Sequence, residues 1–196
     1  GPEAFTEVRY LAHAKQMQAL QYMPSVAGEF KQLFGRDAGG LITTYRAEDA
    51  HTIVVALGSV LGTIKDTIDE LRELGNAIGV IGITSFRPFP ISELRSALGH
   101  AKRVVVVEKC FAVGIGGIVS RDVRMALRDR PQPVVTVVAG LGGRAITKSS
   151  LHRLLIDAMA ETLVNRVLER EKKSRRSGPV AEGILRDIGT VASRIG

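Results

Sequence analysis

Residues 77–120 decide the fold: AIGVIGITSFRPFPISELRSALGHAKRVVVVEKCFAVGIGGIVS. A strand-like apolar run ends at Thr84 and is followed by the turn FRPFP (residues 86–90), and a short amphipathic helix then ends at Gly99. The run VVVV at 104–107 is too apolar for anything but a buried strand, and a glycine cluster leads from it into another helix. Strand, turn, helix, strand, turn and helix in this order predict a parallel sheet covered by helices.

The same alternation continues on both sides of this stretch. Five strands are predicted, at 41–46, 52–57, 77–84, 103–108 and 134–139. Each of the last four is followed by an amphipathic helix, and these helices are predicted to begin near Ser59, Pro90, Gly117 and Thr147. The alternating pattern LITTYR is typical of an edge strand and places 41–46 at the border of the sheet.

The chain divides into three predicted segments. They are a helical extension linking to an upstream domain (residues 1–38), an α/β domain (39–165) and a basic C-terminal tail (166–196). Within the extension, Pro24 separates two predicted helices, at 7–22 and 26–34. The first residues are Gly-Pro without Met, which predicts either a cut inside a longer polypeptide or the scar of a removed tag.

Composition limits the class of protein. The chain has 196 residues, 45% of them hydrophobic, and a net charge of +7 that is concentrated in RVLEREKKSRR at 166–176. Its single cysteine, Cys110, excludes an internal disulfide framework and any cysteine-built zinc or iron–sulfur site from this chain alone. Because the sequence shows neither a membrane-spanning run nor a signal peptide, we expect a cytoplasmic protein.

Three glycine clusters follow predicted strands, where backbone N–H groups can hold a phosphate. The candidate anion-binding residues are Gly58, Ser59, Gly116 and Gly117. The first cluster lacks the lysine of a phosphate-binding loop, and the second lacks the third glycine of a dinucleotide site. The third, GLGGRA at 140–145, fits the dinucleotide spacing but has no acidic strand end about 20 residues later. Close packing of strands against helices also explains all three clusters.

Charged residues at strand ends are the other candidates. Glu108 ends a buried strand and is predicted to cap a helix or to meet a partner, since no second carboxylate or histidine is near it in sequence. Arg87, between two phenylalanines and two prolines, is held rigidly and is predicted to anchor an interface, with at least one of the rings facing a neighbouring domain or subunit. The predicted interface residues are Phe86, Arg87, Pro88, Phe89 and Arg144.

Five motifs occur in a fixed order along residues 1–163. They are GPEAF with EVRY (residues 1–5 and 7–10), YRAEDA (45–50), ALGS (56–59), FRPFP (86–90) and GLGGR with IT (140–144 and 146–147). In this order they resemble the second domain of the alpha chain of pyruvate:ferredoxin and related 2-oxoacid oxidoreductases. Ala145 stands where that family usually has an aspartate, and the basic tail has no counterpart in the pattern.

This resemblance implies a fold like the C-terminal domain of transketolase, a three-layer αβα sandwich with a five-stranded, mostly parallel sheet and one antiparallel edge strand, at 41–46. It also implies a complex that decarboxylates a 2-oxoacid on thiamine diphosphate with Mg²⁺. Such a complex passes electrons through iron–sulfur clusters to ferredoxin and delivers the acyl group to coenzyme A. The implied partners are an upstream thiamine-pyrimidine domain and beta-, gamma- and delta-type subunits.

The chain lacks both the Gly-Asp-Gly…Asn motif for magnesium and diphosphate and the Cys-x-x-Cys motif for clusters. We therefore expect a scaffolding domain that binds no cofactor and has no activity in isolation. Two alternatives stay open: a free-standing nucleotide- or anion-binding α/β module, and a basic adaptor for nucleic acid, which would bind with a steep salt dependence.

Overall fold

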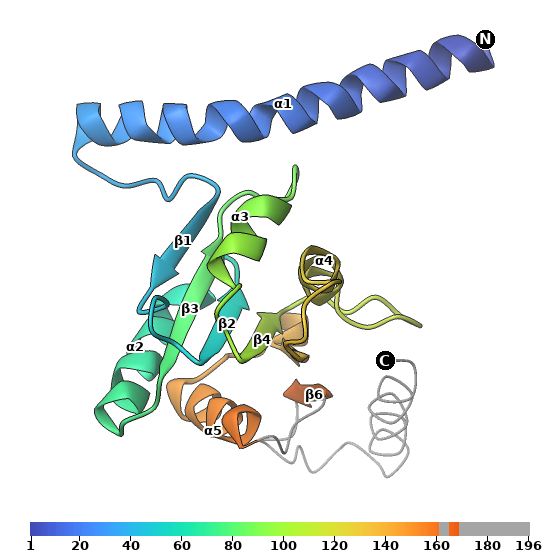
Figure 1. Cartoon of the computed structure of the whole chain (residues 1–196). Helices are drawn as coiled ribbons and strands as arrows, with labels where there is room; N and C mark the ends of the chain where they lie inside the picture. The colour runs from blue at the N-terminus through green and yellow to red at the C-terminus, as the bar shows by residue number, and fades with distance from the viewer. Residues whose placement is uncertain (161–164, 169–196) are drawn as a thin grey trace.

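The computed structural model describes residues 1–160 and, as a backbone strand, residues 165–168. A long helix, α1 (Pro2–Phe34), lies over one end of a three-layer α/β domain and extends beyond it (Figure 1). Within the described residues, no helix combines the length and the apolar character that crossing a membrane requires.

A mixed sheet forms the middle layer of the domain, with the strand order β1-β3-β2-β4-β5-β6. Its strands are β1 (Ile42–Tyr45), β2 (Thr52–Ala56), β3 (Ile78–Ile83), β4 (Arg103–Glu108), β5 (Val134–Ala139) and β6 (Asn165–Leu168). Strand β1 pairs antiparallel with β3, with Ile42 opposite Ile83, and all other neighbouring strands are parallel. The predicted α/β class and the antiparallel edge strand are thus confirmed.

Strand β6 is an addition to the five predicted strands. It pairs in parallel with β5, so the sheet continues across the predicted boundary between domain and tail at 165/166. The rest of the predicted tail, 169–196, lies outside the described residues.

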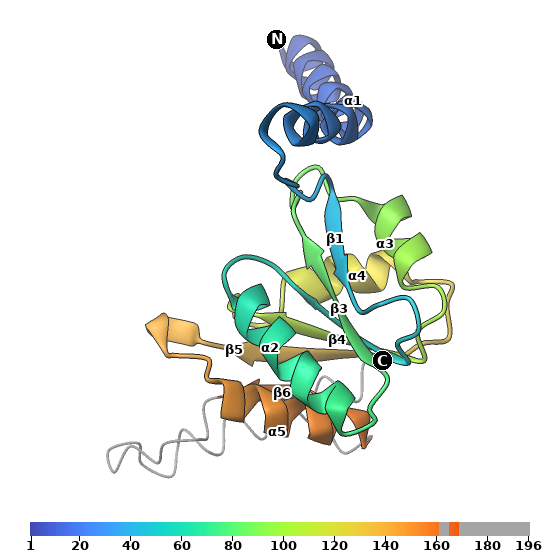
Figure 2. The same cartoon turned by 90° about the vertical axis from the view of Figure 1, so that its left-hand side faces the viewer.

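Two helices cover each face of the sheet (Figure 2). Helices α2 (Val60–Glu73) and α5 (Lys148–Met159) lie on one face, and α3 (Ile91–Ala97) and α4 (Val119–Ala126) lie on the other. The valines of β4 alternate between the two cores: Val104 and Val106 pack with α3 and α4, whereas Val105 and Val107 pack with α2 and α5. The sheet is therefore buried on both faces, as a parallel sheet requires.

Helix α1 differs from its prediction because it runs without interruption through Pro24. A proline inside a helix removes one N–H donor and costs about 3 kcal/mol, but the residues on both sides (QALQYM and SVAGEF) still favour or tolerate helix. The helix ends where predicted, at Gly35, whose φ of 66° lets its N–H bond to the Lys31 carbonyl.

Candidate interaction surface

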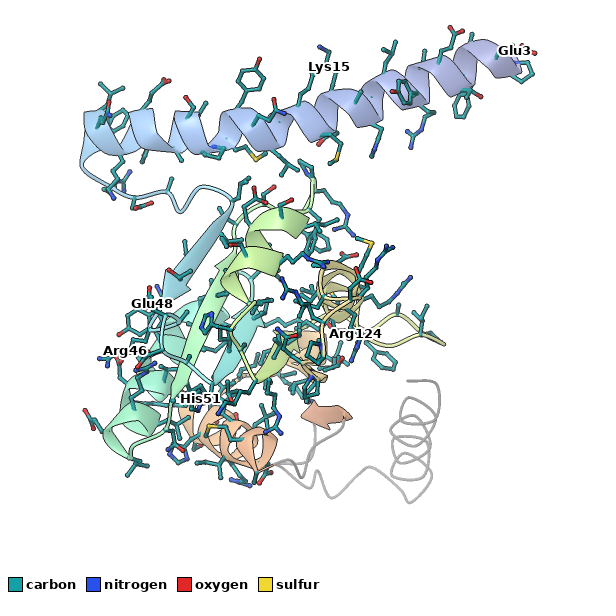
Figure 3. The ribbon with its side chains drawn as sticks, viewed as in Figure 1. Glu3, Lys15, Arg46, Glu48, His51 and Arg124 are labelled. Carbon is teal, nitrogen blue, oxygen red and sulfur yellow. The ribbon has the colours of Figure 1, made fainter. Side chains whose placement is uncertain are left out.

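The predicted site residues all follow strands that end at one edge of the sheet. Gly58 and Ser59 follow β2, the FRPFP turn follows β3, Gly116 and Gly117 follow β4, and Arg144 follows β5. In α/β proteins this carboxyl edge is where ligands and partners usually bind. The structure therefore brings the candidates to a common edge, whereas the opposite edge, where Arg46 and His51 lie, faces away from α1 (Figure 3).

The FRPFP turn folds onto the domain's own core. Phe89 is buried at 8% exposure, and Phe86 is half-buried against the same cluster, with the two rings edge to face at 6.4 Å between centroids. Ser85 donates a hydrogen bond of 2.8 Å to the Pro88 carbonyl and closes the turn. The Phe89 ring packs in one cluster with Leu94 of α3 and Val123 of α4. Phe89 therefore belongs to the core, and the expectation that at least one ring faces a neighbouring domain or subunit remains a prediction for Phe86.

Arg87 connects this turn to α4. Its Nη2 donates to Oδ2 of Asp122 at 2.7 Å, its Nη1 donates to the Phe86 carbonyl at 2.7 Å, and its guanidinium carbon lies 4.1 Å from the centroid of the Phe86 ring. The predicted anchor thus finds its partners within the chain. Because 54% of the Arg87 side chain stays exposed, its outer side can still meet another protein.

Glu108 caps α4 from the end of β4, which confirms the capping alternative. Its buried carboxylate accepts three backbone N–H groups, at 2.8 Å from Ile118, 2.7 Å from Val119 and 3.1 Å from Ser120. These are donors that a helix N-terminus leaves without intrahelical partners, and a negative charge there also interacts favourably with the helix dipole. The carboxylate therefore has a structural role.

Because of this cap, the anion site predicted at Gly116 and Gly117 is wrong. The N–H groups that would hold an anion at the start of α4 already bond to Glu108. Gly117 itself is required by the cap, since a Cβ there would overlap the Glu108 carboxylate and lie 2.5 Å from the Ser120 hydroxyl. The domain's own carboxylate occupies the position that the sequence offered to a ligand.

Arg124, one helical turn further along α4, fixes the helix to the sheet (Figure 3). Its Nη2 donates to the Val134 carbonyl at 2.8 Å and to Oγ1 of Thr136 at 2.7 Å. Partial burial lowers the pKa of Arg124, and the negative charge of Glu108 acts in the opposite direction. Both charged groups thus hold α4 in place.

The remaining two predicted positions are exposed turns. Gly58 has a φ of 77°. Ser59 makes no side-chain capping bond at the start of α2, where its backbone is already helical at φ −63°. Arg144 is exposed after the 3₁₀ turn η1 (Leu141–Gly143), ahead of the capping box that Thr147 forms with Ser150. An anion at Gly58 and an interface at Arg144 remain predictions.

A hairpin loop at residues 109–117 is a feature that sequence reasoning missed. The Ala112 N–H donates to the Gly116 carbonyl at 2.7 Å, and the tip between them exposes 94% of Val113 and 57% of Ile115. The signal in the sequence was the alternation of two β-branched apolar residues, Val113 and Ile115, with Gly114 and Gly116, outside any strand. Exposed apolar side chains at a loop tip favour contact with another protein surface.

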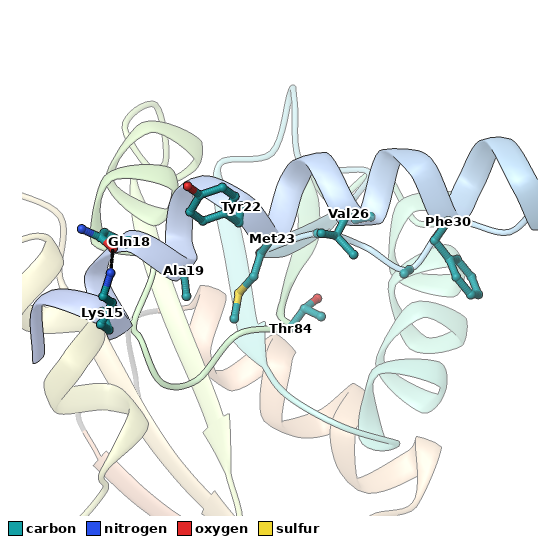
Figure 4. A pocket seen from close by; sticks show the side chains of 11 residues that line it. Lys15, Gln18, Ala19, Tyr22, Met23, Val26, Phe30 and Thr84 are labelled. Carbon is teal, nitrogen blue, oxygen red and sulfur yellow. Dashed lines mark hydrogen bonds between the residues drawn. The ribbon is translucent and has the colours of Figure 1, made fainter. Parts of the chain in front are cut away.

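An open groove separates α1 from the domain (Figure 4). Its volume is about 680 Å³, and it is lined mainly by apolar side chains of α1, with Ala38, Gly40 and Thr84 opposite them. Met23 and Thr84 point toward each other across it (Figure 4). The groove therefore lies beside the carboxyl end of β3, next to the other features of this edge.

The YRAEDA segment, in contrast, has a structural role at the opposite edge. Arg72 of α2 donates to both carboxylate oxygens of Asp49, at 2.6 and 3.0 Å, and to the carbonyls of Arg46 and Ile78. The hydrogen bonds from Arg72 hold the pKa of the Asp49 carboxyl below its usual range. This motif thus joins the β1–β2 turn to α2 and β3.

Known proteins are similar to this chain in sequence over most of its length, and solved structures match part of it. Among solved structures, a split-gene transketolase described as an inactive beta4 tetramer matches with a TM-score of 0.49 and 23% identity, over 64% of this chain and 43% of that one. Pyruvate synthase subunit PorA from Methanothermobacter thermautotrophicus is 36% identical over 154 residues, which is 79% of this chain and 39% of the relative. The same subunit from Methanosarcina barkeri is 34% identical over 190 residues, which is 95% of this chain and 44% of the relative.

The chain spans about two fifths of the length of these curated relatives. The family model described as pyruvate:ferredoxin oxidoreductase core domain II matches residues 50–151, from just before β2 to the first turn of α5. That range contains the FRPFP turn, the Glu108 cap and the hairpin loop, and it confirms the resemblance seen in the motifs. The chain belongs to the family of pyruvate:ferredoxin oxidoreductase core domain II.

Proposed function

We propose that this chain is an interaction domain of the alpha subunit of a thiamine-diphosphate-dependent 2-oxoacid:ferredoxin oxidoreductase. Such a complex converts a pyruvate-type 2-oxoacid to an acyl-CoA by oxidative decarboxylation. Membership in the domain II family and the similarity to pyruvate synthase subunits support this proposal. In it, the domain positions other parts of the complex and carries no reacting group.

One observation carries the proposal: two charged groups at the carboxyl edge, Glu108 and Arg87, already have partners within the domain. Glu108 gives its carboxylate to α4, and Arg87 pairs with Asp122. The most exposed apolar side chains at this edge are Val113 and Ile115, at the tip of the hairpin loop. An edge of this kind is suited to contact with protein rather than to chemistry on a small molecule.

The residues that the structure describes do not fit the cofactors of the complex. Magnesium and a diphosphate need converging oxygen ligands, and no group of three histidine, cysteine or acidic side chains comes together for a metal in the described part of the chain. The turn before α4 is filled by the protein's own carboxylate. We therefore assign thiamine diphosphate, Mg²⁺ and the iron–sulfur clusters to an upstream thiamine-pyrimidine domain and to partner subunits, with ferredoxin as the electron acceptor of the complex.

The test uses the complete complex with two aspartates at the loop tip, Val113→Asp and Ile115→Asp. We expect 2-oxoacid-dependent, coenzyme A-dependent ferredoxin reduction to fall by at least about tenfold, because desolvating two carboxylates in an apolar contact costs more than about 1.4 kcal/mol. The matched control is Leu74→Asp, at a side chain that is 68% exposed after α2. This control should leave turnover unchanged.

Unchanged turnover in the double variant, with the complex intact, would contradict the proposal. So would calorimetric titration showing that the 196-residue chain binds thiamine diphosphate and magnesium at one site per chain. The expected titration is flat.

A further inference from the structure

Helix α1 is a large element that the rest of the described chain does not bury. It has 33 residues, which corresponds to about 50 Å, and none of them is buried. Nine of the fifteen exposed large hydrophobic side chains in the described residues belong to it. Because helices in water depend mainly on packing of an apolar face, this helix needs a partner.

The apolar residues of α1 include a regular stripe. Residues at a strict seven-residue interval share one face of the helix: Phe5, Ala12, Ala19, Val26 and Leu33. Val8, Met23 and Phe30 lie on the same side of the helix, between them. This seven-residue spacing is typical of a helix that packs lengthwise against another helix. We call these eight residues the α1 stripe.

Only part of the α1 stripe lies near the domain. Ala19, Met23 and Phe30 are half-buried and border the groove opposite Thr84 (Figure 4). Toward the N-terminus the stripe continues past the edge of the domain (Figure 1), where Phe5 is 68% and Val8 62% exposed. An occupant must therefore be long enough to follow the helix and narrow enough to enter an open groove of about 680 Å³.

We infer that the α1 stripe and the adjoining groove bind a helix from the part of the same subunit that lies outside this sequence. This inference rests on the proposed function, in which the chain is one domain of a longer alpha subunit. The relatives are more than twice as long as the region they share with this chain. A subunit of that length has further segments that can pack against this domain. A helix fits both the seven-residue spacing and the elongated groove between a helix and a strand end.

The experiment compares amide hydrogen exchange of α1 in the complete subunit and in two double variants of it. Val8→Glu with Ala19→Glu places charges on the α1 stripe. Tyr10→Glu with Met17→Glu is the matched control on the opposite face of the same helix, at side chains that are 69% and 45% exposed. Exchange in β4 serves as an internal measure of domain integrity, because its valines form the core.

We expect the stripe variant to exchange α1 amides at least about tenfold faster than the unaltered subunit, and the control variant to match the unaltered subunit, with β4 protected in all three. Equal exchange in all three subunits would overturn the inference. So would protection of α1 that is lost on dilution, which would identify a second copy of the chain, or protection present only in the assembled complex, which would identify a separate subunit.

This readout is independent of turnover. If the two aspartates at the loop tip leave ferredoxin reduction unchanged while α1 is protected as described, the proposed function fails and the docking surface stands. If turnover falls in the loop-tip variant and α1 is unprotected, the docking surface fails and the proposed function stands.

Discussion

Replacing Glu108 with glutamine keeps the size and shape of a buried side chain and removes its charge. The carboxylate accepts three N–H groups at the start of α4, with both Ile118 and Val119 on Oε2 and Ser120 on Oε1. A glutamine oxygen can take over the pair on one side. Its NH₂ group then faces a third N–H donor that has no acceptor.

The expected loss follows from this geometry. Hydrogen bonds to a charged group contribute about 1.5–3 kcal/mol, and a negative charge at a helix N-terminus adds up to ~1 kcal/mol. Since two of the three bonds can be kept in a weaker, neutral form, we expect Glu108→Gln to lower the free energy of unfolding by roughly 2–3 kcal/mol. For a chain of this size that corresponds to a drop in Tm of roughly 5–10 °C. Glu108→Ala leaves all three N–H groups without a partner and should cost more, about 4 kcal/mol.

The assay is urea unfolding of the 196-residue chain followed by circular dichroism, with hydrogen exchange at the α4 amides as a local readout. The control makes the same chemical change at Glu70, which pairs with Lys148 on the surface at 49% side-chain exposure and should contribute less than about 1 kcal/mol. If Glu108→Gln and Glu70→Gln shift the unfolding midpoint equally, Glu108 is not the cap described here.

Three further changes test other parts of the structure. Val105→Asp places an unpaired carboxylate in the central strand β4, which should cost several kcal/mol and abolish cooperative unfolding or soluble expression. Arg87→Ala removes a half-exposed ion pair and should lower the free energy of unfolding by less than about 1 kcal/mol. Phe89→Ser empties a buried site and should lower it by about 3 kcal/mol, so equal losses of unfolding free energy in urea would refute this ordering. Hydrogen bonds from Arg72 lower the pKa of the Asp49 carboxyl, so the ionised carboxylate stabilises the fold fully above its ordinary pKa near 4. This stabilisation is lost as the pH falls through the lowered pKa of the folded state, and Asp49→Asn should therefore make stability depend less on pH in the acid range.

Much of the domain could be predicted because its signals are local. The run at 104–107 is apolar on both sides of the strand, and in the structure those sides face two separate cores. Val119, Val123 and Ala126 recur at helical spacing and are buried against one of these cores. Such patterns depend only on a residue's neighbours in sequence.

The errors have a common cause in distant contacts. Phe89 is buried in a core that includes residues of α3 and α4, and the turn itself contains no information on these distant contacts. Gly117 resembles part of a phosphate-binding loop, but its missing side chain makes room for Glu108, nine residues earlier. Pro24 predicts a helix break only if the residues around it do not sustain the helix.

The Glu108 cap and the two uncovered apolar features suggest how this domain contributes to a larger protein. By holding α4, the cap also fixes one end of the hairpin loop, since the loop runs directly from Glu108 to the first residues of that helix. The Val113 tip is thus supported by a buried charge, whereas the α1 stripe lies on a helix outside the domain core. Weakening the cap should therefore disturb the loop-tip contact, on which we expect turnover to depend, and leave α1 protected. Charges on the α1 stripe should remove the protection of α1 and leave the loop-tip contact intact. The two variants therefore distinguish a contact inside the subunit from a contact between parts of the complex.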